Sequence, residues 1–102
     1  MPRIELSNKA DSDLEAIHEN YAGLIGYERA DAVIATFIEA FKKLAVFPGM
    51  GRPSQTPDVR ELVMTRYPFV ITYAVRAETV FIVRILHERN ERFSTPRIPD
   101  PS

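Results

Sequence analysis

The sequence predicts an α+β domain in which an N-terminal strand and an antiparallel helical hairpin pack on one face of an antiparallel sheet. Two long segments with helical apolar periodicity occupy residues 8–47, and three segments rich in β-branched and aromatic residues follow them. Short links place consecutive elements side by side. We therefore expect the order strand, helix, helix, strand, strand, strand, with the last three strands as a meander. Since 102 residues suffice for one hydrophobic core, residues 1–102 are expected to form a single domain.

The first strand and the first helix are predicted from the N-terminal residues. Residues 3–6 alternate between polar and apolar side chains, as a half-buried strand does. Ser7 and Asn8 then offer side-chain oxygens for a helix N-cap. Asp11 and Asp13 would lie in the first turn, where the helix dipole favours negative charge. Gly23 and Gly26 are expected to end or interrupt the helix. Its apolar stripe comprises Ala10, Leu14, Ile17, Tyr21 and Leu24.

The second helix is expected over residues 27–47. It carries two neighbouring apolar rows, one made of Val33, Phe37, Phe41 and Leu44 and the other of Ala30, Ile34, Ile38 and Ala45. Because this apolar surface is broader than that of the first helix, we expect the second helix to lie between two partners. Two prolines and two glycines within residues 47–53 then end the helix in a turn.

Three strands are predicted at residues 59–65, 69–75 and 79–87. The last is apolar on both faces, which indicates a central position in the sheet. The tail carries three prolines and is expected to be loosely held from about residue 93. The predicted core includes Phe37, Phe41, Ile71, Tyr73, Val83 and Ile85.

The composition narrows the classes of function. The chain has no cysteine, a formal net charge of −1 and a sequence pI of about 6.1. We therefore expect a cytoplasmic protein with no metal, no cofactor and no membrane segment, for which direct binding to nucleic acid is disfavoured. All eight basic residues after residue 48 are arginines. They are either an ordinary solvated surface or a set of contacts to phosphate or carboxylate groups.

Three local motifs add a resemblance to a known family. They are Leu6-Ser7 with Ala10, Asp13-Leu14 and Ile17; the turn Phe47-Pro48-Gly49-Met50-Gly51-Arg52-Pro53; and Arg60-Glu61-Leu62 with Tyr73 and Arg84-Ile85-Leu86-His87-Glu88-Arg89. Together with the element order, these motifs resemble toxins of the RelE/ParE superfamily, and the ParE branch most closely, over residues 4–92.

The resemblance implies the toxin of a bacterial type II toxin–antitoxin pair, of the kind linked to plasmid stabilisation and growth inhibition. It implies a cognate antitoxin whose C-terminal part wraps and neutralises the toxin in a hetero-oligomer. Two activities occur in the superfamily. ParE-like members inhibit DNA gyrase, whereas RelE-like members cleave mRNA on the ribosome.

The mRNA endoribonuclease requires a base, an acid and a cationic clamp on the phosphate, but no metal. RelE-like toxins use either lysines and arginines with a tyrosine, or a glutamate, arginine and histidine set. The lysine version is absent here, because no lysine follows Lys43. In the histidine version, His87 would be the acid and Glu61 the base, and the clamp would be Arg60, Arg84 or Arg89.

Two features argue against this nuclease. Glu88 next to His87 would repel a scissile phosphate. In a regular strand Arg84 and His87 point to opposite faces, so a bulge before His87 is needed to bring them into one cleft. Each candidate also has a purely structural interpretation. His87 can be a strand-end residue hydrogen-bonded to backbone, and Glu61 can be paired with an arginine or face solvent. Arg84 can be paired with a buried carboxylate or be exposed on the face of the sheet that the helices leave uncovered.

The sequence therefore favours a gyrase inhibitor without catalysis of its own, neutralised by a cognate antitoxin. The alternatives are a ribosome-dependent mRNA endoribonuclease and a non-toxic scaffold that only binds antitoxin. Contacts with the target or the antitoxin are expected from five arginines: Arg52, Arg60, Arg84, Arg89 and Arg92.

Overall fold

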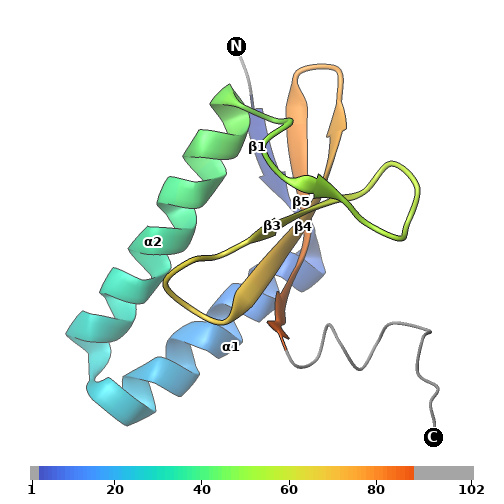
Figure 1. Ribbon diagram of the computed structural model, residues 1–102. Helices are drawn as coiled ribbons and strands as arrows, with labels where there is room; N and C mark the ends of the chain where they lie inside the picture. Colours follow the sequence, from blue (N-terminus) through green and yellow to red (C-terminus); the bar gives the residue numbers. More distant parts are fainter. Residues whose placement is uncertain (1–2, 89–102) are drawn as a thin grey trace, which may run out of the picture.

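The computed structural model describes residues 3–88, which form two helices and five strands (Figure 1). They are β1 (Arg3–Leu6), α1 (Asn8–Ile25), α2 (Tyr27–Val46), β2 (Arg52–Pro53), β3 (Arg60–Val63), β4 (Phe69–Arg76) and β5 (Thr79–His87). The predicted order of helices and of the four longer strands is confirmed. Arg89, Arg92 and the tail expected from about residue 93 lie outside the described residues. Neither helix of the described part is long and apolar enough to cross a membrane.

The sheet has the strand order β1-β5-β4-β3-β2, so β5 lies between two strands, in the interior of the sheet as predicted. It differs from the prediction in being mixed, because β1 runs parallel to β5 while the other pairs are antiparallel. In the meander of β3, β4 and β5, β5 has a neighbour on one side only, and β1 pairs with its other side. A second difference is β2, which pairs with β3 inside the segment predicted as a turn. This strand has only two residues, one of them a proline, and so carries no alternating pattern.

Of the residues predicted to start or end the first helix, Ser7 and Gly26 flank α1, whereas Asn8 and Gly23 lie inside it. The Ser7 side chain caps α1 by accepting a hydrogen bond from the Ala10 N–H at 3.0 Å. Gly26 has a φ of 92°, a region that glycine adopts without a steric cost, and it joins α1 to α2. The two helices diverge from this junction as a hairpin, with the strands on its inner side (Figure 1).

The core lies between the helices and one face of the sheet. The helices contribute Ala10, Ile17, Val33, Phe37, Ala40, Phe41 and Leu44, and the strands contribute Phe69, Ile71, Tyr73, Val80, Ile82 and Ile85. Five of the six predicted core residues are buried: Phe37, Phe41, Ile71, Tyr73 and Ile85. Val83 is half-buried.

A β-bulge explains the position of Val83. Arg84 lies opposite Thr72 and Ile82 lies opposite Tyr73, so Val83 between them has no counterpart on β4. The extra residue shifts the alternation of β5. As a result Ile82 and Ile85 face the helices together, and the predicted grouping of Val83 with Ile85 is wrong.

Candidate functional site

A row of polar residues crosses the face of the sheet that the helices leave uncovered. Tyr73 is buried under the helices, so its neighbour Thr72 points to the opposite face. The residues in register with Thr72 share that face: they are Arg84 on β5, Glu61 on β3 and Arg52 on β2. Nε of Arg52 donates to Oε1 of Glu61 at 3.0 Å. The Glu61 side chain is only 13% exposed. Of the two structural alternatives for Glu61, it is therefore the arginine-paired acid and not the solvent-facing one.

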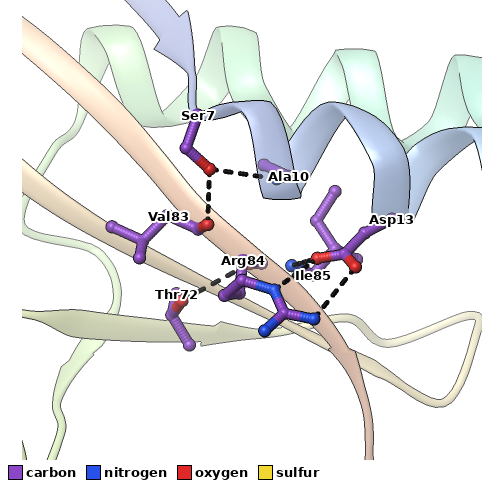
Figure 2. Close-up of polar contacts among 7 residues, drawn as sticks. All are labelled: Ser7, Ala10, Asp13, Thr72, Val83, Arg84 and Ile85. Carbon is purple, nitrogen blue, oxygen red and sulfur yellow. Dashed lines mark hydrogen bonds and ion pairs between the residues drawn. The ribbon is translucent and has the colours of Figure 1, made fainter.

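Arg84 is held by Asp13 of α1 (Figure 2). Its Nε donates to Oδ2 of Asp13 at 2.8 Å and its Nη2 donates to Oδ1 at 3.1 Å. This bidentate hydrogen bond, together with the negative charge of Asp13, raises the pKa of Arg84 above its ordinary value, although partial burial acts in the opposite direction. Arg84 is therefore the carboxylate-paired arginine that the sequence left as one alternative.

Asp13 also completes the hydrogen bonding of the β5 backbone. β1 ends at Leu6, so the part of β5 beyond it has no parallel neighbour. Ser7 Oγ donates to the Val83 carbonyl at 2.7 Å, and the Ile85 N–H donates to Oδ2 of Asp13 at 2.9 Å (Figure 2). The start of α1 thus supplies the partners that a longer β1 would have provided.

Arg60 lies on the helix-covered face of the sheet, in register with Tyr73 on the neighbouring strand. Its side chain anchors the turn between α2 and β2. Its Nε donates to the Gly51 carbonyl at 3.1 Å and its Nη2 to the Gly49 carbonyl at 3.2 Å. The Tyr73 hydroxyl donates to the Pro48 carbonyl at 2.8 Å and accepts from the Gly51 N–H at 2.9 Å. The turn that carries the ParE-like motif is therefore anchored to two strands.

His87 lies at the end of β5 opposite Phe69, on the helix-covered side of the sheet. Its ring meets the Phe69 ring edge-on, with centroids 5.3 Å apart, and Phe69 in turn contacts Phe37 of α2. The half-buried imidazole is thus part of an aromatic cluster at the margin of the core.

The structure does not gather the proposed nuclease residues into one cluster. Arg84 and Glu61 share the uncovered face but are separated by β4, whereas Arg60 and His87 belong to the helix-covered face. A bulge does precede His87, but it also precedes Arg84, so these two still point to opposite faces. Arg89 lies outside the described residues.

One important partner was missed from the sequence. Asp13 was predicted as a first-turn acid and as part of a family motif, but only Asp11 lies in the first turn of α1. Nothing in the sequence links Asp13 to Arg84, 71 residues later. An arginine inside an apolar strand was the available signal that some carboxylate must lie nearby. Among residues 3–88, no three acids or histidines are grouped so that they could hold a metal ion.

Solved structures place this architecture in a class. A chain of the chromosomal ParDE toxin–antitoxin system from P. aeruginosa matches with a TM-score of 0.77 and 36% identity, covering 85% of this chain and 96% of that chain. The E. coli DinJ–YafQ complex matches with a TM-score of 0.57 and 10% identity, over 88% of this chain and 97% of that one. YafQ from E. coli strain BL21(DE3) matches with a TM-score of 0.51 and 13% identity, over 89% and 98%. The fold is that of the RelE/ParE-type toxins.

Sequence comparison identifies the family within this class. The sequence pattern of the ParE toxin of the type II toxin–antitoxin system parDE matches residues 4–92. The Sinorhizobium fredii protein named "Putative toxin Y4kP" is 31% identical over 64 residues, which make up 63% of this chain and 66% of that protein. The chain belongs to the ParE family of type II toxin–antitoxin toxins.

Proposed function

We propose that this ParE-family toxin inhibits DNA gyrase without catalysis of its own and is neutralised by a cognate antitoxin. Membership of the ParE family supports the toxin role, and the P. aeruginosa relative is described as a ParDE toxin–antitoxin system. The expected setting is the cytoplasm, where the toxin is held in a hetero-oligomer with its antitoxin until it is released to act on gyrase.

The observation that carries the proposal is the dispersal of the candidate catalytic side chains. An acid, a base and a clamp must reach one scissile phosphate to cleave RNA. Here Glu61 is paired with Arg52, Arg60 bonds to turn carbonyls, and His87 packs on an aromatic ring of the core margin. This arrangement supports binding to a protein target in preference to RNA cleavage.

Two assays on purified toxin test the proposal. We expect the toxin to block supercoiling of relaxed plasmid by gyrase, or to cause cleaved gyrase–DNA complexes to accumulate. Added antitoxin should restore supercoiling. Cleavage of mRNA in the ribosomal A site, with gyrase unaffected, would support the endoribonuclease instead. A folded chain that binds antitoxin but inhibits neither gyrase nor translation would be the non-toxic scaffold.

A further inference from the structure

The outer side of β1 is a free edge of the sheet. β1 stands at the end of the strand order and pairs with β5 alone. The Arg3 N–H donates to the Glu78 carbonyl, just before β5, at 2.9 Å. The Ser7 N–H donates to the Ile82 carbonyl of β5 at 3.0 Å. Alternate residues of a strand direct their backbone groups to opposite sides, so the N–H and C=O of Ile4 point away from β5. Within the part of the chain that the structure describes, neither group of Ile4 has a hydrogen-bond partner.

The side chains of β1 alternate between the two faces of the sheet. Ile4 packs against the core, in register with the buried Val80 of β5. Arg3 and Glu5 therefore lie on the uncovered face, where their side chains are 69% and 46% exposed. Nη2 of Arg3 donates to Oε2 of Glu5 at 3.1 Å. The exposed side of β1 thus carries one positive and one negative charge, placed immediately before and after Ile4.

This placement of charges makes β1 complementary to a second copy of itself. When two copies of β1 run antiparallel with their Ile4 residues opposite each other, Arg3 of each copy faces Glu5 of the other. The two Ile4 residues then exchange both of their outward backbone hydrogen bonds, and the facing charges occupy the non-hydrogen-bonded positions, where side chains are closest. Opposite charges in facing positions stabilise a strand pair, and like charges destabilise it. The neighbouring register, with Ile4 opposite Leu6, is disfavoured because it places the two Glu5 side chains face to face.

We infer that two copies of this chain associate through β1 into a dimer with one continuous sheet. A twofold axis between the two Ile4 residues relates the copies and places both helical hairpins on the same face of that sheet. The inference rests on the contacts of β1 and does not depend on gyrase or on the antitoxin. Because each copy contributes only a short strand, the contact is far smaller than a standard interface of about 1,600 Å². We therefore expect a weak dimer, with a dissociation constant on the order of 10–100 µM.

Two charge reversals test the dimer when they are measured alone and mixed. Sedimentation equilibrium of the purified full-length chain at low ionic strength gives the association constant. Arg3→Glu and Glu5→Arg should each weaken self-association on the order of ten- to hundredfold, because both facing pairs become repulsive. An equimolar mixture of the two variants should associate within about threefold of the wild type, because every facing pair again joins opposite charges. Mixing can restore only a contact between chains.

The controls separate this effect from folding and from net charge. The Arg3–Glu5 pair is exposed, so both variants should melt close to the wild-type temperature. Arg29→Glu makes the same change of charge at an exposed position of α2 and should associate like the wild type. Added salt should weaken the wild-type dimer, because it screens the facing charges.

Residue-resolved hydrogen exchange locates the contact in the wild-type chain. When the concentration is raised into the range where the dimer dominates, exchange of the Ile4 amide should slow at least about threefold. The Ser7 amide donates to β5 in every copy, so its exchange should not depend on concentration. Slower exchange at Ile4 with no change at Ser7 is the pattern expected of a strand added to the outer edge of β1.

Three results would overturn the inference. The first is a wild-type chain that stays monomeric up to about 1 mM. The second is self-association that Arg3→Glu leaves unchanged, or that the mixture of the two variants does not restore, since the contact would then lie elsewhere. The third is protection of the Ile4 amide that appears only when antitoxin is added, which would assign this edge to the antitoxin. None of these results bears on gyrase inhibition, so the proposed function stands or falls by its own assays.

Discussion

A Cβ atom at Gly51 would lie 2.5 Å from the hydroxyl oxygen of Tyr73 and 2.6 Å from the carbonyl oxygen of Glu61. The Gly51 N–H already donates to that hydroxyl at 2.9 Å. The turn between α2 and β2 therefore approaches the sheet so closely that only glycine fits at this position. The glycine of the ParE-like turn is thus required by packing against a buried tyrosine.

Replacing Gly51 with alanine should lower the free energy of unfolding by about 1–3 kcal/mol, because the added methyl group overpacks the contact between turn and sheet. Urea unfolding measures the loss. Gly49→Ala is the matched control, since nothing lies within 4 Å of its Cβ position. An equal loss in both variants would contradict the steric explanation, because only Gly51 has atoms close to its Cβ position.

Phe41 tests the placement of α2 on the sheet. Its side chain is 3% exposed, so Phe41→Ala should lower the free energy of unfolding by about 3–5 kcal/mol through lost burial and the remaining cavity. Phe47, just after α2, is 64% exposed, and Phe47→Ala should change stability by less than about 0.5 kcal/mol. A measured loss below about 1 kcal/mol for Phe41→Ala would show that another stripe of α2 faces the core.

Asp13→Ala should lower the free energy of unfolding by about 1.5 kcal/mol, because it removes the partner of Arg84 and of the Ile85 N–H. The expected loss is at the low end for charged hydrogen bonds, since the Arg84 side chain is 37% exposed and screened by water. Asp13→Asn keeps an acceptor for Ile85 and should lose less. The control Asp11→Ala removes an exposed first-turn acid, worth about 0.3–1 kcal/mol. A loss no greater than that of the control would contradict the role of Asp13 in completing the hydrogen bonding of β5.

The pH dependence of this contribution follows from the direction of the Arg84 shift. Its pKa is raised in the folded chain, so the stabilisation is fully present below the ordinary arginine pKa and is lost only as the pH rises through the folded value. The titration of Arg84 therefore leaves the stability difference between wild type and Asp13→Ala unchanged between about pH 6 and 9. Urea unfolding at both pH values checks this, and a fall in the difference toward pH 9 would contradict it.

The sequence predicted the elements that have their own pattern and missed those that depend on distant partners. The helical stripes and the β-branched runs gave α1, α2 and strands β3 to β5. The parallel pairing of β1 with β5 was not predicted, because four residues with simple alternation do not specify a partner. The bulge at Val83 was hidden because every residue from Val80 to Val83 is apolar. When every residue of a run is apolar, a bulge that shifts the alternation of the two faces by one residue does not change the apolar pattern of the sequence.

The candidate site was only partly predictable for the same reason. An arginine among apolar residues indicated that Arg84 needs a carboxylate, but the choice of Asp13 depends on how α1 lies against β5. Arg60 was predicted as a binding residue from its place in a motif. Its bonds to the carbonyls of Gly49 and Gly51 became visible only with the folded turn. Side chains with a structural partner cannot be separated from exposed ones by residue type alone.

Two alanine variants separate gyrase inhibition from RNA cleavage. If His87 is the general acid of a nuclease, His87→Ala should reduce cleavage on the order of 10²–10⁴-fold with little loss of stability. For a gyrase inhibitor, the same variant should stay toxic. Because His87 packs on Phe69, a thermal melt must accompany the growth assay.

Arg89 supplies the opposite expectation, although it lies outside the described residues. Arginine contacts with a protein partner are worth about 1.5–3 kcal/mol each when desolvated, which corresponds to roughly ten- to hundredfold in potency. We therefore expect Arg89→Ala to lose toxicity. Arg52→Ala should also weaken binding, whereas Arg60→Ala is expected to disturb the turn that it anchors. A toxic Arg89→Ala together with a harmless His87→Ala, both folded, would favour the nuclease, because only a cleavage mechanism depends on the imidazole more than on the arginine.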